Sequence, residues 1–253
     1  MKILITGSAG QLGWELQRTC PDNIELAAFD LPELDVSDID LIRQYVKNEQ
    51  PEWIINASAY TAVDKAEGDS DLAYLVNAEG AKNLAIVAKE NNIRLLHVST
   101  DFVFDGSQGA PYLPDDAVNP KSVYGASKLQ GDQAVQEILA DDALIIRTAW
   151  VYSAHGNNFV KTMLRLMNER NEMGVVEDQI GTPTWAAELA KVIYLAIEKD
   201  LRGMHHWTDA GAASWYDFSE AIYQLGRNME MIDHEVQINP IPTEEYPTPA
   251  ARP

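Results

Sequence analysis

The chain has 253 residues, with 39 acidic side chains against 19 basic ones and a formal net charge of −20. This length suits one large α/β domain or a domain with a small appendage. The charge argues against nucleic-acid binding through clustered Lys and Arg, and against docking on anionic membranes. The acids are scattered along the whole chain and form no tail, so we interpret them as a solubilising surface.

A single cysteine, Cys20, allows no intramolecular disulfide and fits a reducing compartment. The apolar start at 1–6 runs directly into glycines and lacks the features of a signal peptide. No run approaches the ~18 apolar residues of a membrane span. We therefore expect a cytoplasmic protein with no membrane partner.

Apolar runs alternate with helical patterns in the first 152 residues. The apolar runs predict strands at 2–6, 24–30, 53–59, 94–100 and 144–152. The helical patterns between them predict helices at 11–19, 38–48, 71–91 and 124–139. Near-continuous apolar strands separated by helices are typical of a parallel sheet covered on both faces. We predict an α/β fold, a Rossmann-like doubly wound parallel sheet.

The pattern loosens after residue 152. Helices are predicted at 157–170, from Thr184 as N-cap to 199, and from Ser214 as N-cap to 225. Short strands are predicted at 174–178, 203–208 and 235–241, and the proline-rich end at 240–253 should be largely extended. We divide the chain into an NAD(P)-binding domain at 1–152 and a mainly substrate-binding lobe at 153–253, from which some segments can return to the core.

The first strand runs into glycines spaced G-x-x-G-x-x-G. Gly7 permits the tight turn, Gly10 allows close approach of a pyrophosphate, and Gly13 lets the helix pack on the strand. The start of the helix then faces the pyrophosphate. Small residues that close the third strand also let a cofactor approach. The candidate cofactor contacts of these two segments are Gly7, Gly10, Gln11, Leu12, Gly13, Ala57, Ser58 and Ala59.

Asp30 ends the second predicted strand, where an acid accepts hydrogen bonds from an adenosine ribose. Asp35 is a second candidate, near the adenine. No arginine follows Asp30 to receive a 2′-phosphate, although Arg18 lies within reach on the first helix. The pattern favours NADH without excluding NADPH.

Three reactive side chains meet at the carboxyl edge of this sheet. Thr100 ends the fourth strand, and Tyr124 and Lys128 lie one turn apart on a helix. A lysine ammonium beside a phenol favours the phenolate, so the pKa of the phenol should fall and its proton transfer more readily. His97 is expected to be buried in the strand rather than catalytic.

Several segments resemble the extended short-chain dehydrogenase/reductases, namely the glycine turn at 6–13, Ser-Thr-Asp-Phe-Val-Phe-Asp at 99–105 and the stretch at 124–128. The resemblance sharpens to the dTDP-4-dehydrorhamnose reductase family and covers nearly the whole chain. The segments that carry it lie at 10–16, 61–67, 147–152, 156–159, 178–184 and 246–253.

This resemblance implies that NADPH or NADH reduces the 4-keto group of dTDP-4-dehydro-L-rhamnose to give dTDP-L-rhamnose. It makes Tyr124 the proton donor, lets Lys128 orient the nicotinamide ribose and lets Thr100 position the keto oxygen. An arginine fork also suits a diphosphate. The implied substrate contacts are Thr100, Asp101, Trp150, Asn158, Gln179 and Arg252.

The resemblance leaves a homodimer with Mg²⁺ at the contact open. Glu15 would be the ligand, and its competing reading is an acid in the first turn of a helix. The family is expected to run some tens of residues beyond Arg252 and Pro253, which leaves open whether the chain is truncated there.

Two other functions stay open. Dehydratases of this fold carry Thr-Asp-Glu after the fourth strand, and Phe102 here stands in place of the second acid, which argues against elimination. Another nucleotide-sugar epimerase or reductase remains an alternative. The second function that stays open is a non-catalytic NAD(P)-binding regulatory subunit of the methionine adenosyltransferase type, since fold does not imply function.

Overall fold

The computed structural model describes residues 1–253, apart from the side chain of Asp141. Its centre is a six-stranded sheet of order β10-β5-β4-β3-β1-β2, in which every neighbouring pair is parallel. The predicted Rossmann-like sheet is confirmed. Its strands are β1 (Lys2–Thr6), β2 (Glu25–Phe29), β3 (Trp53–Asn56), β4 (Arg94–Thr100), β5 (Ala143–Thr148) and β10 (Gly203–His206).

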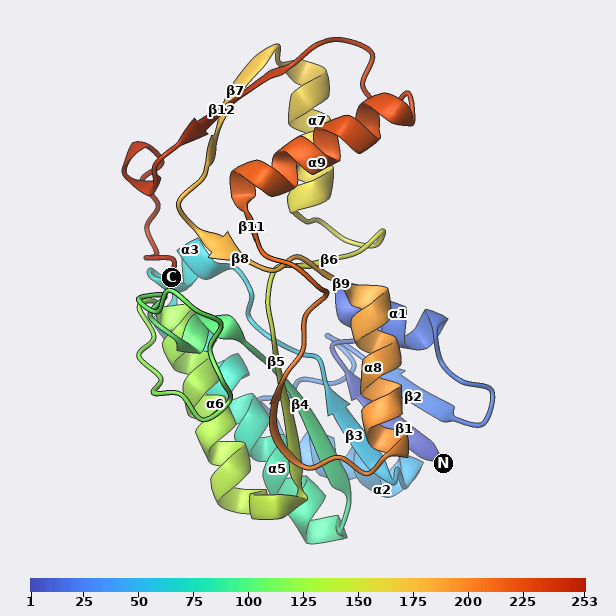
Figure 1. The fold of residues 1–253 in the computed structure, drawn as a ribbon. Helices are drawn as coiled ribbons and strands as arrows, with labels where there is room; N and C mark the ends of the chain where they lie inside the picture. The colour runs from blue at the N-terminus through green and yellow to red at the C-terminus, as the bar shows by residue number, and fades with distance from the viewer.

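Helices cover both faces of this sheet (Figure 1). Successive side chains of β1 point to opposite faces, so Ile3 and Ile5 pack with α1 and α8 while Leu4 packs with α2, α5 and α6. Shorter turns connect these layers. The covering helices are α1 (Gln11–Arg18), α2 (Ile39–Glu49), α5 (Gly80–Asn91), α6 (Val123–Leu139) and α8 (Ala186–Glu198); the shorter ones are α3 (Val63–Ala66), α4 (Ser70–Tyr74), a π-helical turn η1 (Leu75–Glu79) and the 3₁₀ turns η2 (Asp101–Val103), η3 (Ala140–Asp142) and η4 (Thr243–Glu245).

A smaller lobe lies beyond the end of the sheet at which β1 and β4 finish (Figure 1). Its own core includes Met163, Met167 and Ile222. The chain's final residues lie beside α3 in the same figure. The lobe contains α7 (Phe159–Glu169), α9 (Trp215–Asn228) and the parallel pair β7 (Glu172–Val176) and β12 (Gln237–Ile241). Two short pairs join it to the sheet: β6 (Val151–Tyr152) with β9 (Thr184–Trp185), and β8 (Ile180–Gly181) with β11 (Ala213–Ser214).

The structure corrects several predicted boundaries. The strand predicted at 144–152 breaks because Trp150 adopts a φ of 46°, which separates β5 from β6. The strand predicted at 53–59 ends at Asn56, whose side chain accepts a hydrogen bond from Ser58 N. Thr184 is not the N-cap of α8, because it pairs with Val151 and Trp185 takes that position.

The helix predicted at 71–91 is also divided. It consists of α4, the π-helical turn η1 and α5. Such turns are frequent at functional sites.

Two elements from the second half of the chain pack with the sheet and helices of the first half. β10 adds to the sheet beside β5, and α8 packs on α1. The division at residue 152 therefore stays a proposal, with these two segments returning to the core. None of the helices in the part of the chain that the structure describes combines the length and the apolar character that a membrane span requires.

Candidate active site

The glycine turn after β1 is pressed against the end of β3. Gly7 has a φ of +73°, and a Cβ there would lie 2.6 Å from Ser58 N. A Cβ on Gly13 would lie 2.1 Å from the carbonyl oxygen of Gly7. Gly10 has no neighbour closer than 3.3 Å to such a Cβ, and it begins α1 without a side-chain cap. The turn therefore leaves an open side and backbone donors where a dinucleotide pyrophosphate fits.

Asp30 lies directly against this turn. Its carboxylate accepts hydrogen bonds from Ala9 N at 2.7 Å and Leu31 N at 2.8 Å. Arg18 is held by Glu15, at 2.7–2.8 Å, rather than turned toward Asp30. Asp35 accepts from the backbone and hydroxyl of Ser37. Both carboxylates thus accept hydrogen bonds from nearby residues, and only that of Asp30 contacts the glycine turn.

Thr100 and Tyr124 face one another at the carboxyl end of β4. Thr100 Oγ1 donates to Asp101 Oδ1 at 3.2 Å and accepts from Phe102 N. Phe102 packs edge-on against the Tyr124 ring, with centroids 5.5 Å apart. The Tyr124 hydroxyl lies close enough to Thr100 for that hydroxyl to lower the phenol pKa in part. Thr100 and Tyr124 therefore lie together in one small site, as predicted.

The pKa of Tyr124 moves opposite to our prediction. Burial raises it to about 12, and the carboxylates of Asp101 and Asp132 add to the rise. Lys128 is not among the groups that lower it. The phenol therefore holds its proton firmly at neutral pH, the state that a proton donor requires.

Lys128 is 2% exposed and lies beneath Tyr124 on α6. Its Nζ donates to the carbonyl of Val98 at 2.7 Å and lies 3.5 Å from His97 Nε2. Burial lowers the pKa of Lys128 to about 8, which Asp132 partly offsets. His97 is fully buried in β4, as expected.

Tight packing fixes the start of α6. Ser122 caps the helix by accepting from Gly125 N. A Cβ on Gly125 would come within 2.2 Å of the Phe102 carbonyl oxygen, so only glycine lets α6 approach this closely. Asn77, in the π-helical turn, donates to Ser127 Oγ at 2.9 Å and ties the same helix to η1. These contacts set the position of the reactive phenol.

Asp101 gives a pH-dependent stability prediction. Burial raises its pKa to about 6, so the folded chain binds a proton there more readily than the unfolded chain. This contribution to stability is present below pH ~4 and is lost as the pH rises through ~6. Asp101→Asn keeps the acceptor for Thr100 and removes the cost of the charge.

We expect Asp101→Asn to raise the unfolding midpoint by a few degrees at pH 8 and not at pH 4, since 1 kcal/mol is worth about 2–4 °C in a domain of this size. Asp115→Asn, at an exposed position, is the control and should change neither value. Thermal unfolding at both pH values measures the difference. An equal effect of Asp101→Asn at the two pH values would contradict the role of its partly buried charge.

Beyond Thr100 and Asp101, the implied sugar contacts lie in three separate places. Trp150 stacks on Trp215, with centroids 3.5 Å apart, and Trp215 Nε1 donates to Gln179 at 3.2 Å. Gln179 also donates to Thr243 Oγ1. The structure thus brings Trp150 and Gln179 together through Trp215, which the sequence analysis missed.

Asn158 and Gln11 lie together elsewhere, between α1 and α7. Asn158 Nδ2 donates to Gln11 Oε1 at 2.9 Å and to Ser153 O at 2.7 Å, while its oxygen caps α7. Leu12 points into the core of the sheet. Asn158 therefore has structural partners on both sides of its amide.

Arg252 forms a bidentate ion pair with Asp64. Its Nη1 and Nη2 lie 3.0 Å and 2.7 Å from the two carboxylate oxygens, and Ala250 N donates to the same group. The Arg252 guanidinium lowers the pKa of Asp64. Arg252 is thus held beside α3, and Asp64 is a partner that the sequence analysis did not identify.

Glu15, the candidate ligand at a subunit contact, is buried and paired within this chain. It is 1% exposed, accepts from Ser153 Oγ at 2.9 Å and pairs with Arg18. Among the described residues, no group of three or more His, Cys, Asp or Glu side chains is arranged to hold a metal. The alternative interpretation of Glu15 as an acid in the first turn of a helix is also wrong, because α1 begins at Gln11 and its first turn holds no acid.

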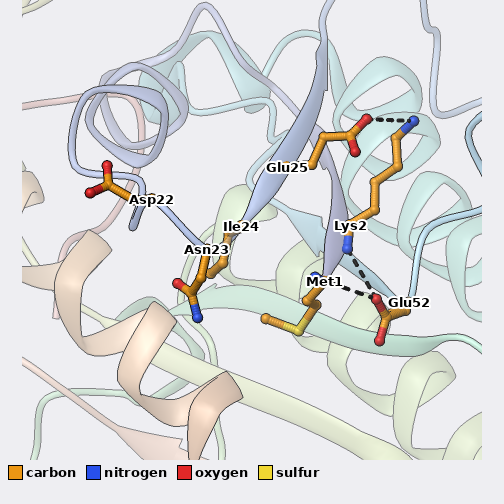
Figure 2. A pocket seen from close by; sticks show the side chains of 7 residues that line it. All are labelled: Met1, Lys2, Asp22, Asn23, Ile24, Glu25 and Glu52. Carbon is orange, nitrogen blue, oxygen red and sulfur yellow. Dashed lines mark hydrogen bonds and ion pairs between the residues drawn. The ribbon is translucent and has the colours of Figure 1, made fainter.

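A hollow at the opposite end of the sheet is not lined by the reactive side chains Thr100, Tyr124 and Lys128 (Figure 2). There Lys2 pairs with Glu25 at 3.1 Å, and its backbone N–H donates to Glu52 at 3.1 Å. These residues start β1 and β2 or precede β3, whereas the reactive groups follow the carboxyl ends. The lining residues are Met1, Lys2, Asp22, Asn23, Ile24, Glu25 and Glu52.

A buried ion pair that was not predicted from the sequence lies behind the site. Asp132 follows Lys128 by one turn of α6, and its Oδ2 accepts from Arg147 Nε at 3.2 Å. Both side chains are at most 5% exposed. The i, i+4, i+8 spacing of Tyr124, Lys128 and Asp132 places them on one helix face and was the available signal.

Comparison with known proteins supports one family. A family profile described as the RmlD substrate binding domain matches residues 1–253. A dTDP-4-dehydrorhamnose reductase of Escherichia coli K12 is 42% identical, over 100% of this chain and 87% of that relative. The chain belongs to the dTDP-4-dehydrorhamnose reductase family. A family member from Aggregatibacter actinomycetemcomitans is 41% identical, over 100% of this chain and 88% of its own length.

Solved structures of dTDP-4-dehydrorhamnose reductases share the fold. The enzyme from Clostridium acetobutylicum has a TM-score of 0.94 and 42% identity, over 100% of this chain and 88% of that one. The one from Bacillus anthracis, a complex with NADP, has a TM-score of 0.94, 40% identity and the same coverage. A dTDP-glucose 4,6-dehydratase from Streptomyces venezuelae, at 17% identity and a TM-score of 0.78, shares the fold alone.

Proposed function

We propose that this chain reduces the 4-keto group of dTDP-4-dehydro-L-rhamnose to give dTDP-L-rhamnose. The observation that carries the proposal is the placement of the Tyr124 hydroxyl, whose pKa burial raises, beside Thr100 at the sheet end where the glycine turn lies. A bound reduced nicotinamide supplies the hydride. Membership of the reductase family and the missing second acid at Phe102 favour reduction over elimination.

The residues of the chain have distinct roles in this proposal. The Thr100 hydroxyl positions the keto oxygen, and Tyr124 gives its phenolic proton to that oxygen as negative charge develops there. Lys128, one turn further along α6, donates to the nicotinamide ribose and so holds the cofactor beside Tyr124. Asp101, beside Thr100, completes the polar wall of the site.

Turnover distinguishes this proposal from a regulatory binding protein. The chain is incubated with dTDP-4-dehydro-L-rhamnose and either NADPH or NADH, and oxidation of each cofactor is followed. We expect steady turnover that needs both the sugar and the cofactor. Cofactor binding without sugar-dependent oxidation would favour the regulatory alternative. A location in the cytoplasm and a homodimer remain predictions.

Both NADH and NADPH should bind, and Asp30 should set their ratio. Its carboxylate suits free ribose hydroxyls and repels a 2′-phosphate. We expect Asp30→Asn to weaken NADH about tenfold, the loss of one charge-assisted hydrogen bond, and to leave NADPH unchanged or tighter. Fluorescence titration of each cofactor measures both affinities.

Asp35→Asn is the matched control for Asp30. Asp35 is engaged by Ser37, so its replacement should affect the two cofactors equally. If Asp30→Asn also weakened both cofactors equally, Asp30 would only shape the glycine turn through Ala9.

A further inference from the structure

A chain of buried polar side chains runs beneath the reactive residues from β3 to β5. It consists of Asn56, His97, Lys128, Asp132 and Arg147, none more than 5% exposed. Buried polar groups are costly unless they are hydrogen-bonded, so each must meet a complementary partner. The donor and the acceptor of each hydrogen bond can therefore be assigned from one of these side chains to the next.

The amide of Asn56 has one allowed orientation. Its Oδ1 lies 3.1 Å from Ser58 N and 3.0 Å from Thr6 Oγ1. A backbone N–H can only donate, so the amide oxygen must face Ser58. The amide nitrogen of Asn56 consequently points toward His97.

This orientation selects one tautomer of His97. Asn56 Nδ2 lies 3.0 Å from His97 Nδ1, and an amide N–H can only donate. Nδ1 must therefore be the acceptor, and the proton lies on Nε2. Burial and the Lys128 charge hold the pKa of His97 well below its usual value, so the ring is neutral.

The proton-bearing nitrogen faces two charged groups of α6. His97 Nε2 lies 3.5 Å from Lys128 Nζ and 3.5 Å from Asp132 Oδ1. That oxygen is buried and has no hydrogen-bond partner among the described residues, while Asp132 Oδ2 is engaged by Arg147. An Nε2–H can donate to Asp132 but cannot accept from an ammonium group.

We propose that His97 is a positioning residue for the reduction, locked by Asn56 as the Nε2–H tautomer so that Lys128 keeps its free ammonium donors for the cofactor crevice. One Lys128 N–H is used by Val98 O at 2.7 Å. In the opposite tautomer, His97 Nε2 would accept a second Lys128 N–H, which would then point into the interior and not toward the cofactor. The inference rests on the proposed function for the role of Lys128. It couples the cofactor-facing end of β3 to the lysine.

Asn56→Asp tests the lock with almost no change in size. A carboxylate still accepts from Ser58 N and Thr6, but it presents an acceptor to His97 Nδ1. We expect ¹⁵N NMR of the side chain to show His97 protonated at Nε2 alone in the wild type and at Nδ1 in the variant. The signal that disappears in His97→Gln assigns the ring.

The kinetic part of the test separates positioning from packing. Asn56→Asp should lower kcat about ten- to a hundredfold, because misplaced reactive groups can cost up to about a hundredfold. His97→Gln can accept from Asn56 and donate toward Asp132, so it should retain kcat within about threefold. His97→Leu fills similar space without these bonds and should lose kcat as Asn56→Asp does.

Three results would overturn the inference. These are a wild-type His97 protonated at Nδ1, an Asn56→Asp variant with inverted tautomer and unchanged kcat, and a His97→Leu variant as active as His97→Gln. The NMR measurement needs no turnover. A failure of the lock is therefore distinguishable from a failure of the proposed reductase activity.

Discussion

Replacing Tyr124 by Phe is expected to lower turnover by roughly 10²–10⁴-fold, the usual contribution of general-acid catalysis. The phenol is the proton donor beside Thr100. Burial raises its pKa to about 12, so the phenol is protonated at neutral pH. The Phe variant keeps the ring that packs against Phe102. Cofactor affinity should therefore be retained, and single-turnover hydride transfer should measure the loss directly.

Tyr223→Phe is the control for this variant. The Tyr223 hydroxyl accepts from Val236 N at 3.3 Å within the smaller lobe, away from the reactive groups. Its loss should leave hydride transfer within about threefold of the wild type. A Tyr124→Phe rate in that same range would remove Tyr124 from the role of proton donor.

Replacing Arg252 by Ala should raise the KM for the dTDP-sugar about ten- to a hundredfold, with the KM for the cofactor unchanged. A charge-assisted donor to a diphosphate is worth about 1.5–3 kcal/mol, and about 1.4 kcal/mol is a factor of ten. The prolines of the final segment favour an extended backbone and reduce the entropy lost on binding. Steady-state kinetics in both substrates measures the split.

The ion pair with Asp64 supplies the matched variant. Asp64→Asn weakens the same contact but keeps the guanidinium, and its amide oxygen can still accept from Ala250 N. If Arg252 grips the diphosphate, the sugar KM of Asp64→Asn should stay within about threefold of the wild type. Equal defects in the two variants would assign the effect to the ion pair instead.

The strands and helices of the sheet could be predicted because their signals are local. The apolar runs of β1 and β4 and the helix of Tyr124 follow directly from residue pattern. The break at Trp150 could not be predicted, because its positive φ accompanies tertiary contacts with Trp215 and Gly181. The π-helical turn likewise places Asn77 for bonds with Tyr60 and Ser127 that lie far away in sequence.

The site shows the same limit. Thr100, Tyr124 and the glycine turn were predicted from position on strand ends and a helix face, and the structure brings them to one edge of the sheet. The predicted direction of the Tyr124 pKa was wrong, because burial raises this pKa and Lys128, which donates to Val98 O, does not lower it. Burial and long-range partners such as Asp64 depend on the whole fold and leave no local pattern.

The most direct test of the reductase site follows one atom. The wild-type chain is given dTDP-4-dehydro-L-rhamnose and NADPH that carries deuterium at the transferable position of its nicotinamide. The proposed function predicts dTDP-L-rhamnose with deuterium on the carbon that bore the 4-keto group, detected by NMR. Cofactor that stays reduced in the presence of the sugar, or deuterium at any other carbon, would contradict it.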